Sequence, residues 1–276
     1  MSDTTVSAYR LPGGKGELFL LVRRPRHISR CVLVVPPFAE EMNKCRRMVT
    51  ETALRLAAEG SAVLVPDLFG TGDSDGDFAE ARWSVWEDDL ARVCAWSSHQ
   101  GAPVTSILAI RLGAALALSA VSAGRIVEAP SAVLWQPVFD GGRHLTQFLR
   151  LRTAAGALAE ARRERVTELR ARLAAGETLE VGGYPVEGGL AADLDALVPP
   201  RELPKPFESI HWMEVIRDPE EGIAESSRRL IGHDEQSAGH VFVRTFTGEP
   251  FWATVEVACL DEMVRATVGA LCGASI

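Results

Sequence analysis

The sequence has little that would direct a chain into or across a membrane. Its first residues, MSDTTVSAYRLPGG, lack the basic start and the apolar stretch of a signal peptide. The most apolar run, Ile107 to Val121, is interrupted by Arg111 and is too short to span a bilayer. The five cysteines are widely spaced and form no C-x-x-C pair, so neither a disulfide framework nor a zinc site is predicted. We therefore expect a cytoplasmic protein without a transmembrane segment.

Basic clusters with interleaved aromatic residues are also missing. The chain carries 37 acidic and 29 basic residues, a formal net charge of -8, and no Lys/Arg run with interleaved aromatic residues. This charge distribution argues against a nucleic-acid partner. With 276 residues, 47% of them hydrophobic, the chain is long enough for one domain with an inserted segment.

Short apolar segments alternate with helical stretches along much of the chain. Most of the apolar segments are continuous runs, which is typical of strands covered on both faces. The pattern predicts an α/β fold with a mostly parallel, doubly covered sheet. The expected strands are 17–22, 31–35, 62–65, 104–109, 132–135, 210–215 and 240–246, and the expected helices are 42–58, 85–97 and 112–122.

The pattern changes after Gln136. Residues 149–176 are rich in Arg, Ala and Glu and read as helical, and the segment ETLEVGGYPVEGG that follows them reads as a small hairpin. We expect an inserted helical and hairpin cap over residues 141–205, with the sheet domain formed by residues 1–140 and 206–276.

Three segments each follow a predicted strand with a loop or turn that is typical of a hydrolase site. The first, VLVVPPFAEEMNKCRRM, joins a buried strand to a Pro-Pro loop and a helix start, and the second, VLVPDLFGTGDSDG, joins a strand to a glycine-rich acidic loop. The third, SILAIRLGAALALSA, has the strand, sharp turn and helix of a nucleophile elbow, with the small residues Ala109 and Gly113 flanking its centre. That centre is Arg111, not Ser, Cys or Asp.

Arginine at this position changes the chemistry that the turn can support. A guanidinium stays protonated in proteins and cannot attack a carbonyl carbon. The histidine of a catalytic triad is also displaced, because the last histidine, His240, begins the final expected strand and TGEPFWATVE follows that strand. A candidate for the triad acid remains in Asp218, after the strand IHWMEVI.

At this point the chain resembles the α/β-hydrolases, and within them the exosortase A system-associated hydrolase type 2 family. The resemblance rests on PPFAEEMNKCRRM (36–48), DLFGTGDSDGDF (67–78), IRLGA (110–114), WQPV and LTQFLRLR within 135–152, and GEPFW (248–252). It implies an α/β-hydrolase fold, an Arg at the elbow as a family feature, and a cytoplasmic protein that accompanies exopolysaccharide production. It implies no particular reaction.

Arg111, Glu40 and Glu41 are the central candidates, and each has two interpretations. Arg111 either binds a carboxylate, phosphate or sulfate group of a ligand, or pairs internally with Glu40, Glu41 or Asp218. Glu40 or Glu41 either activates water directly, or only benefits from the dipole at a helix N-terminus. Cys45 is predicted to be an inert thiol on a helix face.

Five further residues are candidates for substrate contact, each against a structural alternative. Asn43 and Arg47 follow the Pro-Pro loop, and Arg47 either joins a cationic rim or lies on the exposed face of a helix. Tryptophans at strand ends either stack on a sugar or pack in the core. The five are Phe38, Asn43, Arg47, Trp135 and Trp252.

Three functions compete at this stage. The first is hydrolysis of an ester or acyl group on a glycan-related substrate by water that Glu40 or Glu41 activates. The second is a catalytically inactive hydrolase fold that binds an anionic glycan, a lipid-linked intermediate or a partner protein. An acyltransferase ranks last, because no nucleophile or base for it is identified. We expect no cofactor and no metal site, since the acidic loop lacks the glutamate of a calcium loop, and the sequence predicts no oligomeric state.

Overall fold

The computed structural model describes most of the chain. The described residues are 4–126, 129–158, 164–201, 203, 207–220, 222–234, 240–254, 256 and 258–273. Among the described helices, none is both long enough and apolar enough to cross a membrane.

An eight-stranded sheet forms the core of the structure, in the order β1-β2-β4-β3-β5-β6-β9-β10. The pairs β1–β2 and β2–β4 are antiparallel, and every other neighbouring pair is parallel. The residues of β5 are all buried, as expected for a strand covered on both faces. The strands are β1 (Thr4–Pro12), β2 (Glu17–Pro25), β3 (Arg30–Val35), β4 (Ser61–Pro66), β5 (Ser106–Ile110), β6 (Ser131–Trp135), β9 (Ser209–Ile216) and β10 (His240–Thr247).

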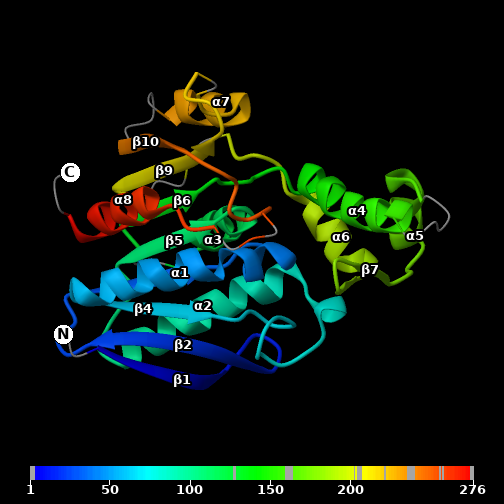
Figure 1. The fold of residues 1–276 in the computed structure, drawn as a ribbon. Helices are drawn as coiled ribbons and strands as arrows, with labels where there is room; N and C mark the ends of the chain where they lie inside the picture. Colours follow the sequence, from blue (N-terminus) through cyan, green and yellow to red (C-terminus); the bar gives the residue numbers. More distant parts are fainter. Residues whose placement is uncertain are drawn as a thin grey trace.

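Helices cover the two faces of this sheet (Figure 1). Helices α1 (Glu40–Ala58) and α8 (Asp261–Cys272) lie on one face, where Met48, Leu56 and Met263 belong to one buried cluster. Helices α2 (Trp83–His99) and α3 (Leu112–Ser122) cover the other face with a second buried cluster, and the short helix η1 (Phe78–Glu80) precedes α2. The predicted mostly parallel, doubly covered sheet is therefore confirmed.

The segment between β6 and β9 lies beside one end of the sheet (Figure 1). It contains α4 (Gly141–Leu158), α5 (Val166–Ala174), the hairpin β7 (Leu179–Val181) and β8 (Tyr184–Val186), and α6 (Gly188–Ala196). Sequence analysis predicts one long helical stretch and the hairpin. The structure has the hairpin, but α4 and α5 are separate elements and α6 is an addition.

Polar and aromatic contacts fix this segment to the sheet domain. The ring of Tyr184 packs on Phe78 at 4.9 Å between centroids, and its hydroxyl accepts a hydrogen bond from Asn43. Arg82 forms an ion pair with Glu187 at 3.1 Å. These contacts hold the hairpin against the loop that precedes α2 and against the first turns of α1.

The chain crosses to its last strand through α7 (Glu225–Asp234), which lies above β9 and β10 in Figure 1. Three elements, β1, α7 and α8 (4–12, 225–234 and 261–272), are not predicted from the sequence. β1 is an edge strand with mostly exposed side chains, so it lacks the continuous apolar run by which the inner strands are recognised.

Candidate functional site

The turn between β5 and α3 has the backbone of a nucleophile elbow. Arg111 adopts φ 55° and ψ -122°, a left-handed conformation that is strained for a residue with a Cβ atom. Its N–H donates to the carbonyl oxygen of Trp135 at 2.9 Å, and its own carbonyl oxygen accepts from Val138 at 3.1 Å. The end of β6 and the loop that follows it thus hold the turn in the strained geometry that presents the central side chain beyond the sheet.

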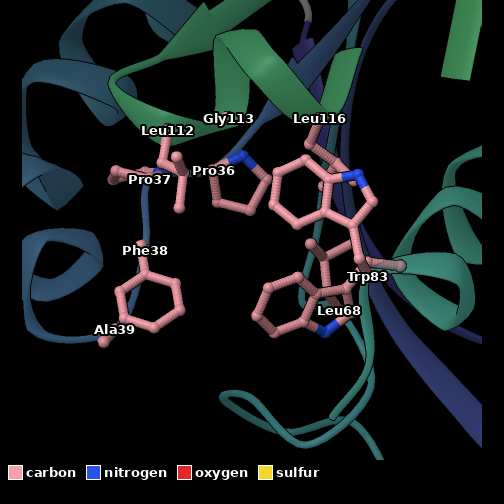
Figure 2. Close-up of a pocket in the computed structure, with 10 residues that line it drawn as sticks. Pro36, Pro37, Phe38, Ala39, Leu68, Trp83, Leu112, Gly113 and Leu116 are labelled. Atoms are coloured by element: carbon pink, nitrogen blue, oxygen red, sulfur yellow. The ribbon is translucent and has the colours of Figure 1, made fainter. Parts of the chain in front are cut away.

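Close packing of α3 on the loop after β3 supports this turn. A Cβ atom at Gly113 would lie 2.4 Å from the carbonyl oxygen of Pro36 and 2.7 Å from that of Val35. Figure 2 shows Gly113 beside Pro36, among the apolar residues that line a small cavity. The volume of this cavity is about 20 Å³. A cavity of this size holds about one water molecule, so it is no ligand site.

The Arg111 guanidinium makes three hydrogen bonds to described residues. Nε and Nη2 donate to Oε1 of Glu41 at 3.2 and 3.1 Å, and Nη1 donates to the carbonyl oxygen of Gln136 at 3.3 Å. The guanidinium carbon lies 4.6 Å from the ring centroid of Trp252, a cation–π distance. A guanidinium has five N–H groups, so two of them remain without a partner among the described residues.

Glu40 and Glu41 begin α1, directly after Ala39, which also has a positive φ of 50°. Burial raises the pKa of the Glu41 carboxyl group, and the nearby Arg111 opposes this shift. Burial also raises the pKa of Glu40, which is half-buried. Oε2 of each carboxylate is buried and has no hydrogen-bond partner within the described part of the chain. Sequence analysis offers Glu40, Glu41 and Asp218 as internal partners of Arg111, and in the structure Arg111 pairs with Glu41.

His144, on α4, is a site residue that sequence analysis missed. Its ring packs edge-on against Phe38 at 5.6 Å between centroids, and it is buried close to Arg111. Burial, together with the positive charge of Arg111, lowers the pKa of His144 to about 3. The imidazole is therefore neutral at physiological pH. Nothing in the sequence around it distinguishes this residue from other helical histidines.

A cleft of about 750 Å³ opens beside the elbow. Its wall includes polar groups from three separate parts of the chain and two tryptophans, and Glu40 and Glu41 are not part of it. Within the cleft, the buried Glu214 accepts hydrogen bonds from the Trp212 indole and the Ala224 N–H. Its lining includes Arg111, Gln136, Arg143, His144, Trp212, Glu214, Arg229 and Trp252.

The structure separates the remaining candidates. Trp252 lies in the loop after the last strand, which is the position expected for the histidine of a catalytic triad, and its ring covers Arg111. Phe38 is buried among aromatic rings, including that of Phe148 at 5.1 Å, and lines the small cavity instead of the cleft. Asn43 is exposed and donates to the Tyr184 hydroxyl at 3.4 Å.

Three candidates need correction. Trp135 is fully buried, and its indole N–H donates to the Thr267 hydroxyl at 2.9 Å, so the side chain packs in the core and cannot stack on a ligand. Arg47 is exposed on α1 and does not line the cleft; burial raises the thiol pKa of the nearby Cys259, and the charge of Arg47 opposes this rise. Asp218 is exposed, accepts a hydrogen bond from the Glu220 N–H at 3.0 Å, and also lies outside the cleft lining.

The acidic loop after β4 has structural contacts. Asp75 accepts the N–H of Glu17 at 2.9 Å, and Asp67 accepts the N–H of Asp73 at 2.9 Å. Across the part of the chain that the structure describes, no three His, Cys, Asp or Glu side chains come together as ligands for a metal ion.

Cys45 lies on the buried face of α1. Burial and the negative charge of Glu41 raise the pKa of its thiol well above the ordinary value. We expect Cys45 in the folded protein to react with iodoacetamide at least about a hundredfold more slowly than an exposed thiol, because thiolate is the reactive form. Mass spectrometry of labelled peptides measures this rate, with the same protein unfolded in urea as the comparison in which the Cys45 thiol is exposed. Labelling of Cys45 as fast in the folded as in the unfolded protein would contradict the expectation.

The same fold occurs in solved esterase structures. Est1E from Butyrivibrio proteoclasticus with bound ferulic acid has a TM-score of 0.68 at 13% identity, over 95% of this chain and 96% of that one. A thermostable carboxyl esterase from Bacillus coagulans has a TM-score of 0.63 at 13% identity, over 99% of each chain. Brefeldin A esterase, a bacterial homologue of human hormone-sensitive lipase, has a TM-score of 0.56 at 17% identity, over 99% of this chain and 76% of that one.

These similarities establish that the chain has the α/β-hydrolase fold, as the sequence predicts. No family model matches the chain, and no curated protein matches it. At identities this low, the reaction does not follow from the fold.

Proposed function

We propose that this chain uses the α/β-hydrolase fold to bind a small anionic molecule beside Arg111, without the covalent chemistry of a nucleophile elbow. One observation carries the proposal: Arg111 occupies the strained elbow at the wall of a cleft of about 750 Å³, with two guanidinium N–H groups that no described residue uses. Paired N–H groups of a guanidinium fit a carboxylate, phosphate or sulfate. The cleft volume is also typical of small-molecule sites.

The surroundings of Arg111 favour binding over acyl transfer. A guanidinium at the elbow supplies no nucleophile. The Glu41 carboxylate contacts the guanidinium directly, and Trp252 covers it, so no space for an attacking water separates Glu41 from Arg111. Of the sequence hypotheses, the binding protein therefore ranks above the hydrolase.

The resemblance to the exosortase A system-associated family gives this proposal a biological setting. We infer a cytoplasmic protein whose ligand is an anionic, glycan-related intermediate of exopolysaccharide production. Residues 141–205 would act as a cap, because α4 contributes His144 to the cleft and the hairpin packs against the loop before α2.

Hydrolysis by directly activated water is the second candidate. It is favoured by the buried, unpartnered carboxylate oxygens of Glu40 and Glu41 and by the raised pKa of each group, since perturbed carboxyl groups cluster at catalytic sites. The position of both residues outside the cleft lining counts against it.

A ligand-binding assay tests the first candidate. Benzoate, phosphate and sulfate are titrated into the purified protein by calorimetry, and we expect at least one of them to bind. Arg111→Lys keeps the positive charge beside Glu41 but loses the planar fork, so it should weaken binding by about tenfold or more. Arg265→Lys, at an exposed arginine paired with Asp261, is the matched control and should leave affinity unchanged. Equal affinity in wild type and Arg111→Lys would refute a role of Arg111 in binding.

A hydrolysis assay separates the second candidate from the first. Wild type, Glu40→Gln and Glu41→Gln are incubated with p-nitrophenyl esters and acetylated sugars. We expect no turnover above background in any of them. Turnover that persists through purification and is lost in one glutamine variant would establish the hydrolase instead.

A further inference from the structure

The electrostatic balance at Arg111 is already neutral before any ligand binds. Arg111 and Glu41 form a 3.1 Å ion pair, and their side chains are 11% and 9% exposed. An anion that binds the two remaining guanidinium N–H groups would therefore share one cation with the Glu41 carboxylate. Two carboxylates in one desolvated site repel each other, and one of them then favours its protonated form.

Few other groups near Glu41 can absorb the extra charge. From α1, Glu40, Lys44 and Cys45 interact with the pair, and Glu40 and Lys44 are half-buried and of opposite sign. The Cys45 thiol is neutral because burial raises its pKa. From α4, His144 faces Arg111 and is neutral because its pKa is about 3. Arg111 is therefore the cation that Glu41 contacts directly and that a ligand bound at its two remaining N–H groups would share, while Arg143 and Arg229 lie elsewhere in the cleft lining.

We propose that Glu41 determines the charge of the ligand that the cleft accepts: an anion binds Arg111 together with one proton, which Glu41 takes up on its unpartnered Oε2. The proposal rests on the proposed function, because it concerns the same site. A proton from solvent forms an O–H bond at Oε2, while Oε1 keeps its hydrogen bonds from Nε and Nη2 of Arg111.

Two features of the site support this assignment. Oε2 is buried without a partner among the described residues, so a proton there disrupts no existing hydrogen bond. Burial also raises the pKa of Glu41, which reduces the free energy needed to protonate it. The site should consequently prefer a monoanion such as benzoate over a dianion such as sulfate, because a dianion would leave a net negative charge at the Arg111–Glu41 pair.

Calorimetry of benzoate binding tests the proposal on the wild-type protein. Titrations in imidazole and in Tris, two buffers of different ionisation enthalpy, report the number of protons taken up. We expect about one proton per benzoate between the pKa of Glu41 in the free protein and its higher pKa in the complex, and an affinity that falls about tenfold for each unit of pH increase in that range. Binding without proton uptake throughout that range would overturn the proposal.

The Glu41→Gln variant provides an independent test. It should bind benzoate with no proton uptake and, at about pH 8, about tenfold more tightly than wild type, because glutamine keeps the acceptor and removes the competing charge. Glu59→Gln, at the exposed C-terminal end of α1, is the control and should keep the wild-type pH dependence. If Glu41→Gln keeps the wild-type slope, the proposal fails while Arg111-dependent binding stands. If neither wild type nor Glu41→Gln binds an anion at any pH, the proposed function itself fails.

Discussion

Replacing Arg111 with methionine is expected to lower the free energy of unfolding by about 3–5 kcal/mol, because it leaves the buried Glu41 carboxylate without its counter-ion. Methionine is not glycine, so the strained backbone at this position is the same in both proteins and does not contribute to the difference. Chemical denaturation with urea measures the change.

The double variant Arg111→Met/Glu41→Met provides the control. With both charges removed and the side-chain volume largely kept, we expect its stability to lie within about 2 kcal/mol of wild type. A single variant as stable as wild type would show that Glu41 is not held as a buried anion.

The pH dependence of the single variant follows from the same contact. Without Arg111, the pKa of Glu41 in the folded state rises further above its unfolded value, since the opposing charge is gone. A raised carboxyl pKa contributes stability at low pH and loses it as pH rises through the folded-state pKa. The deficit of Arg111→Met should therefore be smaller near pH 5 than near pH 8.

Replacing Gly113 with alanine is the second substitution with a large expected effect. The new methyl group would lie 2.4 and 2.7 Å from the carbonyl oxygens of Pro36 and Val35, which are backbone atoms at the end of β3 and cannot rotate away. Either α3 or the Pro-Pro loop must move, and we expect a loss of about 3 kcal/mol in the free energy of unfolding.

Gly232→Ala is the matched control for this substitution. Gly232 lies inside α7, and a Cβ atom there would have no neighbour within 4 Å among the described residues outside its own helix. Alanine should stabilise the helix by up to about 1 kcal/mol. Equal effects of the two substitutions would mean that α3 does not pack on the loop as closely as the structure describes.

The elements that sequence analysis predicted best are those with buried, continuous apolar runs. Strands β3 and β5 were found because both their faces are covered, and the elbow was found because Ala109 and Gly113 are small where two backbones meet. Helix α6 was missed because its sequence begins with two glycines, and its stability comes from packing against α4 instead of from helix propensity.

The candidate site was predicted less completely than the fold, because tertiary contacts determine which side chains come together in it. The pairing of Arg111 with Glu41 was among the stated alternatives, but proximity in the fold had to select it. His144 is contributed by α4, and no spacing in the sequence relates that helix to the elbow. Trp135 was misassigned because a strand end fixes the position of a residue without fixing the side to which its ring turns.

The ion pair also constrains the ancestry of such a chain. A lineage that exchanged the elbow nucleophile for arginine before residue 41 became acidic would have passed through a buried cation that cannot lose its proton. A lineage that acquired the glutamate first could have kept it neutral, because a buried carboxyl group can remain protonated at physiological pH. The two orders of substitution therefore differ in the stability of their intermediates, and the intermediate with the glutamate alone is the more stable one.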